Sequence, residues 1–126
     1  MRNIPAPRVL PETLAFWQAA DAGRYLVKRC QSCGEVHHYP RDVCPFCMST
    51  DTVWQDSPGL GTVYAFSTRG KDEAACTLAY VTLDEGVTVM SNLVDCAPQQ
   101  MHIGQRVRVV FKPSEGGHAV PMFTPA

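Results

Sequence analysis

The spacing of hydrophobic positions changes along this chain and divides it into segments with different predicted structures. Between residues 11 and 22, apolar and aromatic side chains alternate with polar ones as on one face of a helix, with Pro11 at the start and Gly23 just after the end. Proline at the first helical position and glycine after the last are typical helix boundaries. We therefore predict an amphipathic helix over residues 11–22, followed by a short strand at residues 25–27.

The second half of the chain contains short runs of β-forming residues separated by turn residues. The pattern predicts five strands, near residues 61–69, 76–84, 87–94, 105–111 and 118–123. In the fourth of these, Val107, Val109 and Phe111 alternate with Arg106 and Arg108, which predicts one buried and one solvated face. Five antiparallel strands of this length, with a longer connection between the third and the fourth, describe a small closed barrel such as the OB-fold.

Glycines occupy the predicted bends of this barrel. Gly59 and Gly61 suit the bulge or sharp bend that lets a first strand curl into two sheets. Gly86 ends a predicted three-residue hairpin at residues 84–86, at a position where the left-handed conformation favours glycine. We therefore expect the first strand to bend strongly and the second and third strands to form a tight hairpin.

The composition of this 126-residue chain fits a small globular protein. Hydrophobic residues make up 45% of it and charged residues 18%, which excludes a disordered or collagen-like chain. No apolar run approaches the roughly 18 residues of a membrane span, and residues 2–11 lack the apolar core of a secretion signal. We therefore expect a cytoplasmic protein that does not interact with membranes.

The charge distribution disfavours nucleic acid as a partner. The formal net charge is -1, and residues 51–126 contain five basic and eight acidic side chains. An OB module that binds nucleic acid needs a basic groove and aromatic side chains for base stacking. Tyr80 is the only aromatic residue in the predicted strands at 76–84 and 87–94. A nucleic-acid-binding module of zinc ribbon and OB-fold therefore stays only as an alternative.

Four of the six cysteines form a regular pattern. Two residues separate Cys30 from Cys33, two separate Cys44 from Cys47, and ten lie between the pairs. In a reducing compartment such pairs are more often metal ligands than disulfides, and two facing loops of this kind supply the tetrahedral thiolate shell that zinc prefers. We predict one structural zinc ion, whose binding energy folds a segment with too few apolar residues for a core of its own. Iron, as in rubredoxin, is the alternative on ligand type.

The remaining candidates for chemistry are two histidines and two cysteines. We expect His37 and His38 to be solvated or to lie around the metal shell, because four thiolates already fill it. Cys76 and Cys96 have no catalytic signature around them, and buried cysteine is usually inert. Since the sequence also has no Ser-His-Asp order, P-loop or GxGxxG motif, we predict no catalytic residue in the chain.

Several motifs occur together in an order that resembles a known family. They are Phe16-Trp17, the four cysteines with Tyr39-Pro40-Arg41 between the pairs, Gly59-Leu60-Gly61-Thr62-Val63-Tyr64, and Leu83-Asp84-Glu85-Gly86-Val87. From about Leu10 to Pro125, the chain resembles the acyl-CoA-associated proteins that join a rubredoxin-like zinc ribbon to an OB-fold, long catalogued as a domain of unknown function.

This resemblance implies a mainly β protein in three parts: an N-terminal arm and helix (residues 1–25), the zinc ribbon (26–55) and a five-stranded OB-fold barrel (56–126). It implies that Cys30, Cys33, Cys44 and Cys47 hold the zinc ion. It also implies an accessory subunit, inactive alone, that supports assembly and substrate positioning in a hetero-oligomer. The family's partners are thiolases, thiolase-like acyltransferases, thiolase-fold aldolases or CoA-ester hydratases.

Such a subunit needs a surface for its partner enzyme and could also contact CoA esters. Exposed aromatic side chains are favoured anchors at protein interfaces, so Phe16 or Trp17 is a candidate contact. The alternative is that Trp17 packs on the domain and Phe16 lies at its margin. Four basic residues are candidates for contacts with CoA phosphates, with solvated charge as the alternative for each: Arg69, Lys71, Arg106 and Arg108.

Overall fold

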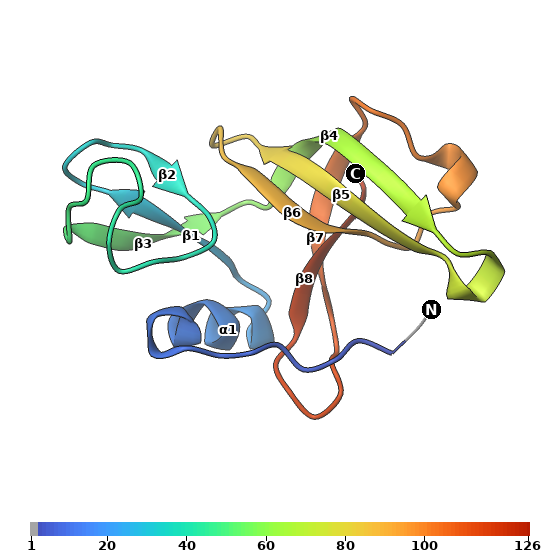
Figure 1. The fold of residues 1–126 in the computed structure, drawn as a ribbon, viewed down its shortest axis with the longest axis horizontal. Helices are drawn as coiled ribbons and strands as arrows, with labels where there is room; N and C mark the ends of the chain where they lie inside the picture. The colour runs from blue at the N-terminus through green and yellow to red at the C-terminus, as the bar shows by residue number, and fades with distance from the viewer. Residues whose placement is uncertain (1–2) are drawn as a thin grey trace.

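The computed structural model describes residues 3–126, which form one helix, a small three-stranded sheet and a closed five-stranded barrel (Figure 1). This is the mainly β architecture that the sequence predicts. The first two residues of the predicted N-terminal arm lie outside the described range. Within residues 3–126, no helix has the length and apolar character needed to cross a membrane.

The helical segment has the predicted limits, but its first turn is tighter than an α-helix. Pro11 opens a 3-10 turn, η1 (Pro11–Thr13), which runs into α1 (Leu14–Asp21). The buried Thr13 hydroxyl accepts a hydrogen bond from the backbone N–H of Leu10 and donates one to its carbonyl, and these bonds hold the turn. Gly23, with φ 76°, follows the helix as predicted.

The ribbon segment forms a sheet in the order β2-β1-β3. The strand expected at residues 25–27 is longer, β1 (Tyr25–Cys30), and pairs antiparallel with β2 (Val36–His37) and β3 (Thr52–Ser57). The sequence pattern missed β2 and β3. Asp56 and Ser57 look like a linker in the sequence, but they pair with Leu26 and Tyr25 of β1.

All five predicted barrel strands are present, with ends within two residues of the predicted ones. They are β4 (Leu60–Arg69), β5 (Cys76–Leu83), β6 (Thr88–Leu93), β7 (Arg106–Lys112) and β8 (Val120–Pro125), in the order β4-β5-β6-β8-β7. The expectation of an entirely antiparallel barrel is wrong, because β6 and β8 run parallel. These two strands meet at a single register pair, Leu93 with Phe123, which we call the seam.

Two glycines serve different needs of the barrel, one a close backbone approach and the other a turn with positive φ. A Cβ on Gly61 would lie 2.7 Å from the Thr82 carbonyl oxygen, so this position tolerates only glycine without rearrangement. Gly86, at φ 102°, sits in the β5–β6 hairpin as predicted. The register shift that bends β4 lies further along, between Val63 and Ala65, rather than at the glycines.

One hydrophobic core joins the helix, the ribbon and the barrel. The Tyr25 ring, at the start of β1, lies 6.0 Å from the Phe123 ring of β8 and 6.0 Å from the Phe16 ring of α1, measured between ring centroids. The helix contacts both β1 and β8 (Figure 1). The ribbon is therefore held against the barrel by shared packing.

Candidate metal centre

Two loops bring four cysteine sulfurs to within 4.8 Å of one another. The sulfur of Cys30 lies 3.5 Å from that of Cys47, and the sulfur of Cys33 lies 3.7 Å from that of Cys44. A tetrahedral ion with metal–sulfur bonds of about 2.3 Å requires sulfur–sulfur distances of about 3.8 Å. The four thiols therefore fit a tetrahedral metal ion, and they are the only such group among the residues that the structure describes.

The two cysteine loops share one backbone conformation. The Gly34 N–H donates to the Cys30 carbonyl, and the Met48 N–H donates to the Cys44 carbonyl, each over 2.9 Å. Gly34 and Met48 are both left-handed, with φ 79° and 67°. The first loop has glycine at this position. The second holds a methionine there, although this conformation costs a residue with a side chain roughly 1–2 kcal/mol.

Backbone N–H groups point at the sulfurs and favour the thiolate form. A hydrogen bond from the Cys33 N–H, reinforced by the Cys47 thiol, lowers the pKa of Cys30 to about 6 although Cys30 is buried. The Phe46 N–H donates to the Cys44 sulfur over 3.4 Å. The backbone N–H groups of Glu35 and Ser49 act in the same direction at Cys33 and Cys47, but burial and the neighbouring cysteine thiols outweigh them and raise the pKa of both thiols. Because the thiolate is the form that binds metal, Cys30 is the ligand that is most ready to bind a cation.

The histidines near the first loop are packing residues. His37 is buried, and its Nε2 accepts a hydrogen bond from the Arg41 N–H over 3.3 Å. The His38 ring packs against Phe16 and Tyr25, and burial lowers the pKa of His38 to about 4. The expectation of solvated histidines is therefore wrong, because His37 is buried in β2 and the His38 ring packs between the ribbon and the helix.

Neither aromatic residue of the helix is exposed. Phe16 is 3% exposed and Trp17 is 7% exposed. The Trp17 indole N–H donates to the Tyr39 hydroxyl over 3.2 Å, while the Phe16 ring contacts Tyr25 and His38. The premise that Phe16 or Trp17 is exposed and free to anchor a partner is therefore wrong. The alternative that places Phe16 at the margin of the domain is also wrong, because α1 packs against both β1 and β8.

Arg106 is committed to a partner within the chain. Its guanidinium binds both carboxylate oxygens of Asp84, over 2.8 and 3.0 Å. This hydrogen bonding holds the pKa of Asp84 below its ordinary value. Arg106 is therefore a poorer candidate for a CoA phosphate than the sequence suggests, since binding phosphate would break this pair.

The other basic candidates do not form a single cluster with Arg106. Arg108 lies two residues further along β7, opposite the start of β4, whereas Arg69 ends β4 and Lys71 follows it. Arg106 pairs with Thr62, seven residues before Arg69, which corresponds to roughly 23 Å at about 3.3 Å per residue. One phosphate group cannot contact both ends of this strand.

Four exposed apolar side chains form a patch that the sequence alone did not connect. We call this patch, on the outer surface of β4, β5 and β6, the outer face; it consists of Tyr64, Leu78, Tyr80 and Met90, which are 48% to 68% exposed. Tyr80 is paired with Met90, and Ala65, next to Tyr64, is paired with Tyr80. The sequence signal for this patch was the presence of apolar residues at strand positions that the alternating pattern assigns to the solvent side.

Two family descriptions match adjoining parts of the chain. Residues 17–53 match "ChsH2, rubredoxin-like zinc ribbon domain" and residues 54–112 match "ChsH2, C-terminal OB-fold domain". A chain of the Ltp2-ChsH2(DUF35) aldolase superposes with a TM-score of 0.82 at 28% identity, over 94% of this chain and 98% of that one. A DUF35-family protein of unknown function from Sulfolobus solfataricus shares the fold, with a TM-score of 0.65 at 11% identity, over 92% of this chain and 86% of that one.

Curated relatives agree with these matches. A DUF35 domain-containing scaffold protein of Methanothermobacter thermautotrophicus is 30% identical over 82% of this chain and 84% of its own length. Another scaffold protein of this description, from Methanocaldococcus jannaschii, is 34% identical over 67% of this chain and 64% of its own length. A probable enoyl-CoA hydratase alpha subunit of Thermomonospora curvata is 29% identical over 97% of this chain, which spans only 40% of that relative. The chain belongs to the ChsH2/DUF35 family, which the rubredoxin-like zinc ribbon and the OB-fold domain define.

Proposed function

We propose that this protein is a non-catalytic accessory subunit of a hetero-oligomeric enzyme complex that acts on acyl-CoA together with a thiolase-fold partner. The strongest support is the match to nearly the whole ChsH2(DUF35) chain of an aldolase, because the two chains agree in fold and extent. The description of two relatives as scaffold proteins supports the same role. The subunit would act by positioning its partner's loops or substrate, which can lower a reaction barrier without chemistry of its own.

We propose zinc as the ion that Cys30, Cys33, Cys44 and Cys47 hold. Four soft thiolates at tetrahedral spacing suit zinc, and a shell of four protein ligands has no open position for a substrate. The ion would then stabilise the ribbon and take no part in acyl-CoA chemistry. Arg106 is occupied by Asp84, so the proposed contacts for CoA phosphates are either Arg69 and Lys71 at the end of β4 or Arg108 opposite its start.

A subunit of a CoA-ester hydratase is the second candidate. The observation that favours it is the similarity to a probable enoyl-CoA hydratase alpha subunit, which includes 97% of this chain. Since this chain spans 40% of that relative, the catalytic partner in such a complex would correspond to the remainder of that relative.

A turnover assay with acyl-CoA distinguishes an accessory subunit of either kind from an enzyme that is active alone. The chain alone is expected to show no turnover, and the partner enzyme is expected to reach full activity only when the chain is added. An acyl-CoA product released by the purified chain would refute the accessory role. Aldol cleavage or thiolysis by the assembled complex supports the first candidate, whereas hydration of an enoyl-CoA supports the second.

We propose that the outer face contacts the partner enzyme. Tyrosine and methionine are enriched at protein interfaces and charged residues are depleted there, and the outward positions of β5 and β6 carry no charged residue. Apolar patches of this kind on small proteins mark interaction sites. The partner should therefore present an uncharged, largely apolar surface at this position.

Met90→Glu is expected to weaken binding to the partner enzyme at least tenfold, because it places an unpaired charge in an uncharged interface. Isothermal titration calorimetry with the purified partner measures the effect. Ile103→Glu is the matched control, because Ile103 is similarly exposed but lies in the β6–β7 connection, outside the outer face. Equal affinity of the two variants would contradict this assignment of the interface.

A further inference from the structure

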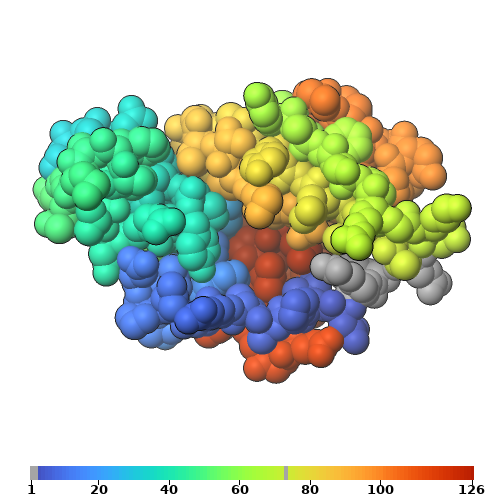
Figure 2. Space-filling model, in the orientation of Figure 1, coloured from blue at the N-terminus to red at the C-terminus, as the bar shows by residue number. Residues whose placement is uncertain are grey.

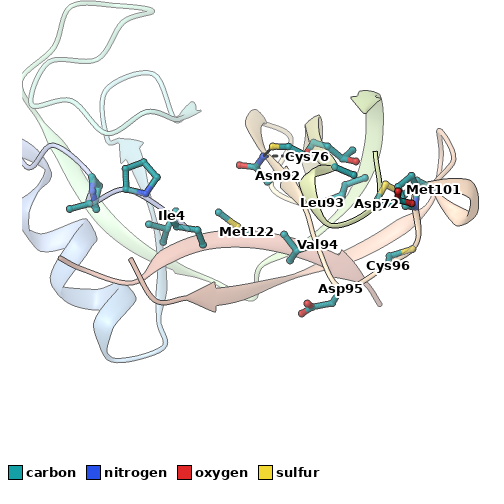
Figure 3. A pocket seen from close by; sticks show the side chains of 17 residues that line it. Ile4, Asp72, Cys76, Asn92, Leu93, Val94, Asp95, Cys96, Met101 and Met122 are labelled. Carbon is teal, nitrogen blue, oxygen red and sulfur yellow. Dashed lines mark hydrogen bonds between the residues drawn. The ribbon is translucent and has the colours of Figure 1, made fainter. Parts of the chain in front are cut away.

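The seam of the barrel opens into a pocket of about 490 Å³ that the proposed function does not use. The pocket lies beside the register pair of Leu93 and Phe123, where β6 and β8 meet in the closed barrel. Figure 2 shows the hollow between the N-terminal arm and the barrel, with β8 at its floor. In Figure 3, Met122 lies on the floor of the pocket, and Cys76 and Asn92 lie opposite it. Ile4, from the N-terminal arm, lines the pocket on the side where the arm lies.

Residues 4–7 of the N-terminal arm form one wall of this pocket. The Glu115 N–H donates to the Ile4 carbonyl over 2.8 Å, and Pro5 forms a β-bridge with Glu115. Gly117 lies so close to the arm that a Cβ there would be 2.7 Å from the Cβ of Ala6. The loop between β7 and β8 therefore seats the arm by hydrogen bonding and by close contact.

Several polar groups in the pocket wall are already paired with each other or with neighbours. The Asn92 amide donates to the Thr77 carbonyl over 3.1 Å and to the Cys76 sulfur over 3.5 Å. The Asp95 carboxylate binds Lys112 over 2.6 Å. A ligand would therefore meet few groups that still need a hydrogen bond, which favours an apolar ligand.

The charge of the described wall disfavours an anion. Among the described residues that line the pocket, Asp72 and Asp95 are carboxylates and none is lysine or arginine. The remaining lining is mostly aliphatic or sulfur-containing, and Met101 and Met122 have flexible thioether side chains that adapt to a ligand's shape. The wall chemistry therefore suits an uncharged hydrocarbon group.

We propose that this pocket binds an uncharged aliphatic chain of about ten carbons. Small-molecule sites typically measure about 300–1,000 Å³, and this pocket is about three times the roughly 150 Å³ cavity that holds benzene. The chain could belong to a free lipid or to an acyl thioester, because both carry the same hydrocarbon. This site does not depend on the partner enzyme proposed above.

Protection of two thiols tests the proposal directly. Cys76 and Cys96 both line the pocket, so decan-1-ol should slow their alkylation by iodoacetamide at least tenfold in the metal-loaded protein, measured by peptide mass spectrometry. Affinity should rise about fourfold per methylene from hexan-1-ol to decan-1-ol. Decanoate should bind at least tenfold more weakly than decan-1-ol, because its carboxylate would share the pocket with Asp72 and would meet no lysine or arginine in the described lining. Absence of protection, or no dependence on chain length, would overturn the proposal.

Two neighbouring alanines supply matched variants. Ala75 lines the pocket, whereas Ala74 is exposed and does not. With Cys96 as the readout, Ala75→Phe should weaken decan-1-ol binding more than tenfold, and Ala74→Phe should leave it unchanged. Unchanged binding in a folded Ala75→Phe protein would refute this location. S-decanoyl-N-acetylcysteamine, an uncharged thioester, identifies the source of the chain: tighter binding than decan-1-ol indicates an acyl thioester, and equal binding indicates a free chain.

Discussion

Cys44→Ser is expected to release the metal ion and unfold the ribbon strands β1, β2 and β3, because Cys44 is one of the two fully buried members of the four-cysteine group. The binding energy of structural zinc in small finger peptides is about 10–16 kcal/mol, which is comparable to the stability of a whole domain. Elemental analysis should find about one zinc per chain in the unchanged protein and none in the variant. Amide hydrogen exchange should show loss of protection in the ribbon strands.

Cys96→Ser is the control for this experiment, because Cys96 lies outside the four-cysteine group. It should keep the metal and the protection of the ribbon. Metal retained by Cys44→Ser would refute the ligand assignment. A red, iron-containing protein would instead support iron as in rubredoxin, the alternative that the ligand type leaves open.

Phe16→Ala is expected to lower the free energy of unfolding by about 3–5 kcal/mol, because it leaves a cavity where the helix, the ribbon and the barrel meet. The Phe16 ring lies 5.0 Å from Trp17, 5.6 Å from His38 and 6.0 Å from Tyr25, measured between centroids. Equilibrium unfolding in urea measures the change.

Phe46→Ala is the matched control, since Phe46 is 63% exposed and should change stability by less than about 1 kcal/mol. One other result would restore the prediction that Phe16 contacts the partner enzyme. If Phe16→Ala leaves stability unchanged but weakens binding to the partner enzyme, the ring is an anchor for that enzyme and not part of the core.

The features predicted well are those that short-range spacing determines. Two Cys-x2-Cys pairs fix a metal site because each pair lies in one tight loop, and the four sulfurs indeed come together. The barrel strands follow from alternation, as in Val107 and Arg106, because one side of each strand must be buried. Gly34 and Gly86 have the positive φ values that their positions in turns suggest.

The features missed depend on which elements pack together. Phe16 and Trp17 cannot share one direction on a helix, so the burial of both becomes visible only once α1 is known to contact β1 and β8. The short strand β3 has no fully buried side chain, so its pattern resembles a loop. The parallel meeting of β6 and β8, and the pocket beside it, depend on the strand order rather than on any single strand.

The most direct test of the accessory role is to purify the tagged full chain from its native host under non-denaturing conditions and to identify the bound proteins by mass spectrometry. We predict a hetero-oligomer that contains a thiolase-fold enzyme in a fixed stoichiometric ratio to this chain. Recovery of the chain as a 13.9 kDa monomer with no stoichiometric partner would contradict the proposed function.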